Sequence, residues 1–359
     1  MPHMQVVRCS RIQIGRADHD IAGSARIRRS WPWHDLIINF GSNDMWLEQS
    51  CPVCRRSEAR GVVTIDDQHA PGDGSHVVRC LGCGLRRLDR RPSDSALAGY
   101  YLDSYNSFVG RTRGPLKQRV WNLLRDFSGG HNVATARVPT LRRLAYRATS
   151  RLVDVNLDLS SREEAEILDV GCGYGDLLLY FSSRGYGVRG VEGDSRAVER
   201  AAELGLRVEL EDPAALSLPS DSIDVTIFCH SLEHLPGPLE ALEEAARVSK
   251  PNAEIHIAVP NGDAAGLQVE GADWGHLSFP LHFWYFDARS LVSLLTEAGL
   301  RVQTVSYRMT WGFHVQLWRK QATQEGPSAA LMAALSILRR VAASPNRKDV
   351  LRVVAVKPA

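Results

Sequence analysis

The chain has 359 residues, 44% of them hydrophobic, with a formal net charge of +2 and seven cysteines. This length favours two or three folding units, and the apolar content is ample for a core. The sequence contains no apolar run of about 18 residues, the length of a membrane span, and its N-terminus lacks the apolar core of a signal peptide. We therefore expect a cytoplasmic protein without a membrane span.

Charge is unevenly distributed along the chain. Lys and Arg outnumber Asp and Glu within residues 1–160, whereas acidic residues are in excess in the remainder. Chance and solvated helix faces explain such asymmetry as well as function does. The functional alternative is a basic front half that meets an anionic partner, such as a sugar nucleotide, a phospholipid surface or RNA.

Two cysteine pairs follow an Arg-rich N-terminal extension, residues 1–47, which is either partly disordered or an overextended start. The pairs have C-x-x-C spacing and comprise Cys51, Cys54, Cys80 and Cys83. Two intervening residues let both thiolates of a pair point inward, and four thiolates match a closed, tetrahedral structural zinc site. Disulfides would need an oxidising compartment, which nothing in the chain indicates. We therefore predict a zinc-binding module over residues 48–90.

The segment from 91 to 160 is interpreted as a helical linker or a cap on the substrate side. Its first four residues, Arg-Pro-Ser-Asp from Arg91 to Asp94, are typical of a linker that ends in a helix cap. Residues 115–152 favour one or two basic amphipathic helices, broken by Gly129 and Gly130. These helices would either cover the substrate cleft or simply connect the two neighbouring units.

The most informative segment is Ile-Leu-Asp-Val-Gly-Cys-Gly-Tyr-Gly, residues 167–175. Its apolar run ends in Asp169, and Gly171, Gly173 and Gly175 follow at alternate positions. A strand that runs into a glycine loop at the start of a helix is where an α/β sheet holds a nucleotide-like ligand. Dinucleotide sites favour G-x-G-x-x-G, whereas here the third glycine comes one residue earlier.

The segments after this loop predict an alternation of strands and helices. A second strand over 186–192 ends in Glu192, at about the 20-residue spacing expected of a ribose-hydroxyl acceptor. A carboxylate suits that role because it accepts hydrogen bonds from two vicinal hydroxyls. Further strands are predicted at 207–210, which Asp212 follows, at 222–229 and at 255–260.

The end of the chain predicts one more helix and two strands. Asp287 suits an N-cap and Gly299 a C′ residue, so we expect a helix between them. Strands follow over 301–307 and 351–356. A helical insertion, residues 326–345 with its apolar positions over 328–343, separates the strands. Three roles are open for this insertion: packing on the sheet edge or cleft, lying on a membrane surface, or forming a dimer contact.

These pieces, in this order over about residues 160–310, resemble the class I S-adenosylmethionine (SAM)-dependent methyltransferases. The resemblance implies a doubly wound, Rossmann-like α/β sheet of seven strands with the last antiparallel, in a domain spanning residues 161–359. An acidic residue after the third strand typically caps the adenine amino group in this family, a role that falls on Asp212. The implied SAM-binding residues are Asp169, Gly171, Gly173, Gly175, Glu192 and Asp212.

Together with the cysteine module, the chain resembles a bacterial methyltransferase group over about residues 48–310. Some members of that group are C-methyltransferases of nucleotide-linked deoxysugars, and others lie in polysaccharide or glycolipid pathways. The resemblance implies a small-molecule acceptor that contains a sugar. The alternatives are an RNA methyltransferase with an N-terminal zinc module and a degenerate SAM-binding scaffold, which the intact glycine loop disfavours.

The loops after the fourth and fifth strands should face the transferred methyl group, because ligands bind beyond the carboxyl ends of the strands. Methyl transfer to a hydroxyl or an acidic C–H needs a base, and histidine suits this task. His276 and His282 lie in the 274–282 run, which resembles the family's active-site loop, and His234 lies in a Leu-Glu-His-Leu segment that often shapes the SAM pocket. The alternative for each is a buried histidine bonded to a backbone carbonyl.

A second metal site is disfavoured at the fourth strand. A ubiquinone-pathway O-methyltransferase subgroup has Glu-x-x-Glu-His there, with a divalent metal on the acidic pair. In this chain His230 stands where the first Glu would be.

Overall fold

The computed structural model describes residues 46–65, 75–93, 96–97 and 164–359, without the side chains of a few of them. The predicted helices over 115–152, and all but the last two residues of the predicted N-terminal extension, lie outside the described residues. Within the described part, no helix combines the length and the apolar composition that a membrane span requires.

The main sheet has seven strands in the order β12-β13-β10-β9-β6-β7-β8. β13 pairs antiparallel with both β10 and β12, and the remaining pairs are parallel, so the predicted sheet with its last strand antiparallel is confirmed. In chain order the strands are β6 (Glu166–Val170), β7 (Gly187–Glu192), β8 (Val208–Leu210), β9 (Ile223–Cys229), β10 (Ser249–Pro260), β12 (Arg301–Arg308) and β13 (Val350–Val356).

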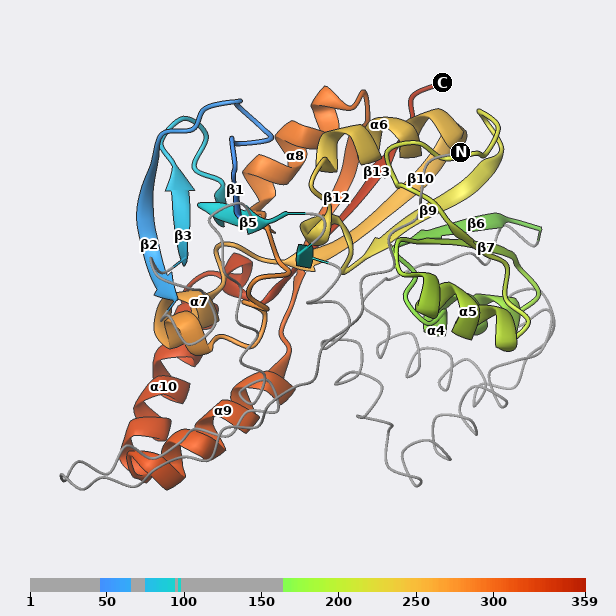
Figure 1. Cartoon of the computed structure of the whole chain (residues 1–359). Helices are drawn as coiled ribbons and strands as arrows, with labels where there is room; N and C mark the ends of the chain where they lie inside the picture. Colours follow the sequence, from blue (N-terminus) through green and yellow to red (C-terminus); the bar gives the residue numbers. More distant parts are fainter. Residues whose placement is uncertain (1–45, 66–74, 94–95, 98–163) are drawn as a thin grey trace, which may run out of the picture. The chain divides into compact units, whose positions relative to one another are not determined.

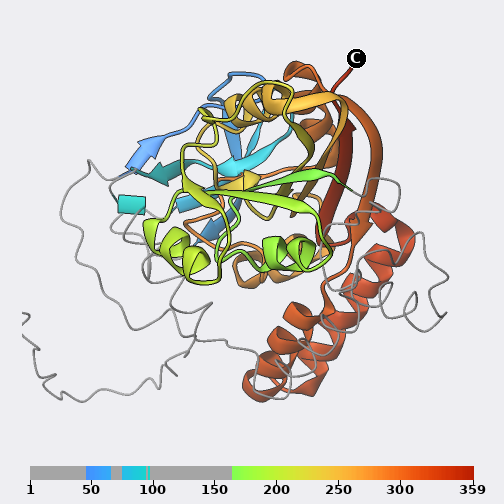
Figure 2. The same ribbon diagram turned by 90° about the vertical axis from the view of Figure 1, so that its right-hand side faces the viewer.

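Helices cover both faces of this sheet: α4 (Asp176–Ser182) and α5 (Ser195–Glu203) one face, α6 (Pro238–Val248) and α8 (Ala288–Glu297) the other (Figures 1 and 2). Covered on both sides, the central strands carry near-continuous apolar runs, as parallel strands do. Ile167, Leu168 and Val170 of β6, for example, are each at most 1% exposed.

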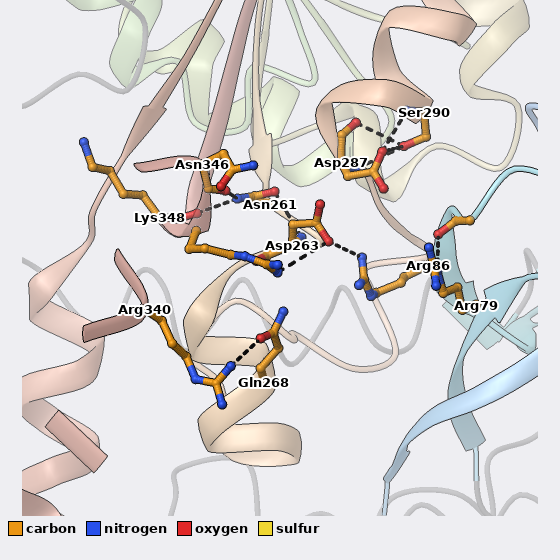
Figure 3. Close-up of polar contacts among 12 residues, drawn as sticks. Arg79, Arg86, Asn261, Asp263, Gln268, Asp287, Ser290, Arg340, Asn346 and Lys348 are labelled. Atoms are coloured by element: carbon orange, nitrogen blue, oxygen red, sulfur yellow. Dashed lines mark hydrogen bonds and ion pairs between the residues drawn. The ribbon is translucent and has the colours of Figure 1, made fainter. Parts of the chain in front are cut away.

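The predicted cap of α8 is confirmed in detail. Asp287 Oδ1 accepts a hydrogen bond from Ser290 N at 2.8 Å, and Ser290 Oγ accepts one from Asp287 N at 3.0 Å, which forms a capping box (Figure 3). Gly299 follows the helix at a φ of 77°, in the left-handed region that suits a C′ glycine.

The cysteine segment forms a small sheet that a later segment joins. Its strands are β2 (Ala59–Ile65), β3 (Ser75–Cys80), β4 (Arg86–Leu88) and β11 (Trp284–Tyr285), in the order β11-β4-β3-β2. A separate ribbon pairs β1 (Trp46–Glu48) with β5 (Arg90–Pro92). The expectation of a linker at Arg91 and Pro92 is therefore wrong, because both residues pair in a strand.

The insertion before β13 is a pair of helices, α9 (Trp311–Gln324) and α10 (Pro327–Ala343), which lie side by side (Figure 1). α10 matches the predicted helix, whereas α9 was not predicted. α10 also contacts the short helix α7 (Ala265–Glu270), where Arg340 donates a hydrogen bond to Gln268 (Figure 3). Several apolar residues of α10 stay exposed, and the choice among packing on the sheet edge or cleft, a membrane surface and a dimer contact stays a prediction. The exposed residues are Leu331, Met332, Leu335 and Leu338.

Candidate functional site

The glycine loop lies where β6 ends and α4 begins. Gly171, Gly173 and Gly175 have φ angles of 73°, 54° and 79°, a region that L side chains rarely adopt. A β-carbon on Gly171 would lie 2.5 Å from Cβ of Ser231, and one on Gly175 would lie 2.4 Å from a methyl of Leu206. The loop therefore keeps its shape only with glycine at these positions.

Two predicted carboxylates meet beside this loop. Glu192, at the end of β7, accepts hydrogen bonds from the backbone N–H groups of Gly173 (2.8 Å), Gly193 (2.8 Å) and Asp194 (3.1 Å). Asp169 is 3% exposed, and its burial, together with the charge of Glu192, raises its pKa to about 7. Because both carboxyl groups are largely shielded from solvent, they create a local negative field that favours a cationic ligand.

Asp212 stands apart from this pair. It is exposed after β8, and its Oδ1 accepts a hydrogen bond from Ala214 N at 2.9 Å, which caps the turn. Its role toward an adenine ring stays a prediction.

The loop after β9 meets the glycine loop directly. The Ser231 hydroxyl donates to the Val170 carbonyl at 2.5 Å, so the carboxyl ends of β6 and β9 are joined. This is the switch point of the sheet, since the chain continues from β6 toward one edge and returns at β9 to build the other. Open α/β sheets bind their ligands in the crevice at such a point.

His230, His234 and His282 gather around one buried carboxylate. Glu233 is 0% exposed in the 3₁₀ helix η2 (Leu232–His234), and its Oε1 lies 3.4 Å from His230 Nδ1 and 3.9 Å from His282 Nε2. The rings of His234 and His282 meet edge to face at 4.5 Å. His276 stacks on His230 at 6.1 Å between centroids.

These histidines are held in different ways. His282 Nδ1 lies 2.9 Å from the His276 carbonyl and must donate to it, and His234 bonds to the backbone of Leu281. Burial, followed by the proximity of His234, lowers the pKa of His282 to about 3, and burial also lowers the pKa of His234. His282 is therefore buried and bonded to a carbonyl, the arrangement that was the alternative to a base, and His234 is half-buried and also bonded to a carbonyl.

His276 is bonded to a side chain instead. Its Nε2 lies 2.8 Å from the hydroxyl of Thr310, and its ring packs against Trp274 at 5.4 Å. This ring nitrogen thus faces a side-chain hydroxyl, whereas those of His234 and His282 face backbone carbonyls.

Glu233, His234 and His282 also form a potential donor set for a cation. One ligand atom from each lies within 4.8 Å of the others. A carboxylate with two imidazoles suits a divalent transition metal. The sequence disfavoured a metal here because of His230, and it did not foresee that the loop after β10 would contribute His282.

The four cysteines lie together as predicted. Cys51 Sγ is 3.4 Å from Cys83 Sγ, Cys54 Sγ is 3.3 Å from Cys80 Sγ, and all four sulfurs fall within 4.8 Å of one another. Tetrahedral zinc with Zn–S bonds of about 2.3 Å would separate its sulfurs by about 3.8 Å, close to this spacing. Burial raises the pKa of the Cys51 and Cys83 thiols, whereas Cys80, although burial opposes its ionisation, has its pKa lowered to about 7 by the N–H groups of Cys83 and Gly82 and by neighbouring thiols. The donor set therefore fits a structural zinc ion.

The cysteine module supports the loop that carries His276 and His282, residues 274–282, which we call the histidine loop. β11 pairs with β4, and the Leu88 N–H donates to the Phe283 carbonyl at 2.9 Å. On its other side the Phe283 N–H donates to the Glu233 carbonyl at 2.9 Å. Sequence reasoning missed this connection because a two-residue strand leaves no period to detect.

A second connection runs through the end of β10. Asp263 accepts from Arg86 of β4 at 2.9 Å, and Asn261 donates to the carbonyls of Asn346 (2.7 Å) and Lys348 (2.6 Å) before β13 (Figure 3). These two polar residues therefore bind the cysteine module and the C-terminal segment to the same loop.

Comparison with known proteins agrees with this geometry. Residues 141–305 match the family model described as a methyltransferase domain. The chain therefore resembles methyltransferases over these residues, and its main sheet has the Rossmann-like methyltransferase fold. This methyltransferase domain includes the glycine loop, both carboxylates and the histidine loop.

Several relatives resemble the methyltransferase domain at low identity. They include an uncharacterized 37.1 kDa protein in transposon TN4556 of Streptomyces fradiae, 29% identical over 56% of this chain and 64% of its own length. A ubiquinone biosynthesis O-methyltransferase of Ralstonia nicotianae is 27% identical over 44% of this chain and 64% of its own length. A 27-O-demethylrifamycin SV methyltransferase of Amycolatopsis mediterranei is 28% identical over 36% of this chain and 51% of its own length. The chain thus spans less than two thirds of each of these relatives.

Among solved structures, the [4+2]-cyclase SpnF has a TM-score of 0.42 and 21% identity, over 67% of this chain and 93% of that one. A SAM-dependent methyltransferase from Methanosarcina mazei has a TM-score of 0.40 and 21% identity, over 55% of this chain and 94% of that one. Likeness at this level supports no inference about activity.

Proposed function

We propose that the protein is a SAM-dependent methyltransferase that acts on a hydroxyl or an acidic C–H group of a small-molecule acceptor. The observation that carries this proposal is the junction of the glycine loop with the histidine cluster at the switch point of the sheet. There the Ser231 hydroxyl bonds to Val170, and Asp169 and Glu192 lie on one side while Glu233 and its histidines lie on the other.

The acidic side fits the cationic methyl donor. SAM carries a sulfonium and an ammonium group, and the field of Asp169 and Glu192 favours both. When bound, SAM supplies a sulfonium methyl that passes to the acceptor atom while the electron pair of the broken C–S bond stays on sulfur. The chain's own part is to position the acceptor and to remove its proton.

His276 is the residue we assign to proton removal. The acceptor's O–H or C–H proton passes to a ring nitrogen of His276, and the electron pair that it leaves forms the new bond to the methyl carbon. General-base assistance of this kind typically contributes about 10²–10⁴-fold to the rate.

The class of acceptor rests on the relatives and on the resemblance of the cysteine module. The named relatives belong to ubiquinone biosynthesis and to rifamycin methylation, which both concern small molecules. A sugar-containing acceptor, nucleotide-linked or in a glycolipid, remains our finer proposal because the module resembles that of sugar methyltransferases. An RNA acceptor is the alternative, and the four-cysteine site is proposed to hold structural zinc in either case.

Calorimetric titration with SAM tests the first step. The parent should bind SAM, whereas Gly173→Val should lose binding, because its φ of 54° strains a β-branched residue in the loop. Equal affinities would exclude the glycine loop as the SAM site. Transfer from methyl-labelled SAM to nucleotide sugars, to phenolic quinone precursors and to RNA then identifies the acceptor class.

A further inference from the structure

The helix α10 has two apolar sides, and the fold uses only one of them. On the buried side Ala330 is 8% exposed and Ile337 is 0% exposed, and the helix contacts both α9 and α7. Arg340 adds the hydrogen bond to Gln268 of α7 at 3.0 Å (Figure 3). α10 is therefore anchored through one side, and the other is left to solvent.

The solvent side of α10 carries an apolar stripe. Leu331, Leu335 and Leu338 follow the i, i+4, i+7 spacing that lines up side chains along a helix, and they are 58%, 50% and 45% exposed. Met332, which is 66% exposed, widens the stripe. Among the described residues, no other helix, strand or turn carries more than one exposed large apolar side chain. Single exposed apolar residues are normal on a protein surface, whereas a contiguous group of them marks an interaction site.

The segment that exposes this stripe is also basic. From Trp311 to Lys348 the chain has one acidic residue, Glu325, and six basic ones. The basic residues are Arg319, Lys320, Arg339, Arg340, Arg347 and Lys348. Over residues 161–310 the balance is the opposite, with 24 acidic and 11 basic residues. Positive charge is thus concentrated in the same part of the chain as the exposed apolar side chains.

Arg339 lies at the edge of the stripe. It follows Leu335 by four residues, the spacing of neighbours on one helix face, and its side chain is exposed. The methylene stem of an arginine covers apolar surface while its guanidinium stays in a polar layer. Leucines flanked by such a cation are typical of a helix that lies in the plane of a membrane interface, with its apolar side among the acyl chains and its cations at the headgroups.

We propose that the stripe of Leu331, Met332, Leu335 and Leu338 docks on the surface of an anionic phospholipid bilayer, with the basic residues of the α9–α10 segment attracted to the headgroup phosphates. A second copy of this chain is the competing occupant. A two-fold contact through this face would bring two equally basic surfaces together, which opposes association. An anionic bilayer complements both the apolar stripe and its charge.

Sedimentation of the full-length chain with lipid vesicles tests the proposal and needs neither SAM nor an acceptor. The parent should bind vesicles made of equal parts phosphatidylcholine and phosphatidylglycerol. It should lose most of this binding on vesicles of phosphatidylcholine alone, and also at about 1 M salt, where charges are screened within about 3 Å.

Two variants separate the apolar and the charged contributions. Leu335→Ser should weaken partitioning onto the anionic vesicles by about tenfold or more, because it removes an apolar side chain from the middle of the stripe. Arg339→Gln should weaken it by about fivefold. Leu204→Ser is the matched control, since Leu204 is 43% exposed at the end of α5, and it should bind as the parent does. All three positions are exposed, so thermal unfolding of the variants should match that of the parent.

Three results would overturn the proposal. The first is a parent that does not bind anionic vesicles, and the second is a Leu335→Ser protein that binds them with parental affinity. The third is a dimer in light scattering that Leu335→Ser converts to a monomer, which would assign the stripe to a second copy. No methyl transfer is measured, so each result is independent of the function proposed above.

Discussion

Asp169 is a carboxyl group whose ordinary pKa is near 4 but which titrates near neutrality at the end of β6. Burial is the main cause, and the neighbouring charge of Glu192 adds to it, so that the pKa is raised to about 7. At pH 6 the group is therefore mostly protonated, and at pH 8 it is mostly charged. Only the charged form attracts a cation.

SAM affinity should consequently increase with pH. We expect Kd measured by calorimetry to be about tenfold lower at pH 8 than at pH 6, because binding at low pH must first remove a proton from Asp169. Asp169→Asn should bind more weakly at pH 8 and retain only the dependence that arises from the ligand's own groups. The same pH dependence in parent and variant would contradict this assignment.

The three predicted histidines should respond differently to truncation. His276→Ala should lower turnover by about 10²–10⁴-fold with nearly unchanged SAM affinity, since its ring is proposed to touch the acceptor. His234→Ala and His282→Ala remove rings bonded to backbone carbonyls, so they should act mainly through loop folding or SAM binding. Kinetics and calorimetry on one acceptor separate these effects, and a His276→Ala enzyme with parental kcat would place the base elsewhere.

At the scale of elements, the two-residue strand β11 joins the cysteine module to the histidine loop. It pairs with β4, and Tyr285 of this strand bonds through its hydroxyl to the Leu277 carbonyl at 2.8 Å. Loss of the proposed zinc ion should therefore reach the histidine loop.

Cys80→Ser tests this connection. The variant should release about one equivalent of zinc, increase hydrogen exchange over residues 274–285 and lower turnover, while SAM affinity stays largely intact because the glycine loop belongs to the main sheet. Leu81→Ser is the matched control, since Leu81 is 66% exposed in the same knuckle. A zinc-free Cys80→Ser protein with parental exchange in the loop would show that the module does not support it.

The elements that the sequence predicted well are those with strong local signals. Buried runs such as Ile167 to Val170, the alternate glycines and the Asp287 cap each specify their structure within a few residues. α9 was missed because the residue that anchors it to the rest of the fold, His314, is bonded to Glu270 and Asp349. These partners lie 44 and 35 residues away in the sequence, so no local pattern reveals them. The site followed the same rule: the histidines were predicted, but Thr310 was not, because only the folded chain brings it to His276.

For the whole molecule, the bonds of buried His314 to Glu270 and Asp349 link stability to pH. The pKa of His314 is raised from about 6.5 to about 9, so the native state holds this proton more tightly than the unfolded chain. The resulting stabilisation is fully present below about pH 6.5 and is lost as pH rises through about 9.

Urea denaturation at pH 7 and pH 10 measures this contribution. The difference in unfolding free energy between the parent and His314→Gln should shrink at pH 10 by about 3 kcal/mol, from the shift in pKa at 1.36 kcal/mol per unit. Differencing the two proteins removes the contribution of other groups that titrate in this range. A difference that does not change with pH would mean that His314 is neutral at pH 7.

The position of β13 has a consequence for the order in which the molecule is assembled. Among the described strands, β12 is joined to the sheet only through β13, and β10 pairs with β13 along seven consecutive residues from Glu254 to Pro260. During synthesis β10 and β12 are therefore both made before the strand that unites them. Until residues 350–356 have left the ribosome, β10 presents an unpaired edge to other chains, and Asp349, the residue just before β13, cannot yet reach Thr310, to which it is hydrogen-bonded in the folded chain. The half of the sheet that carries β10 and β12 is thus completed only when β13 is made.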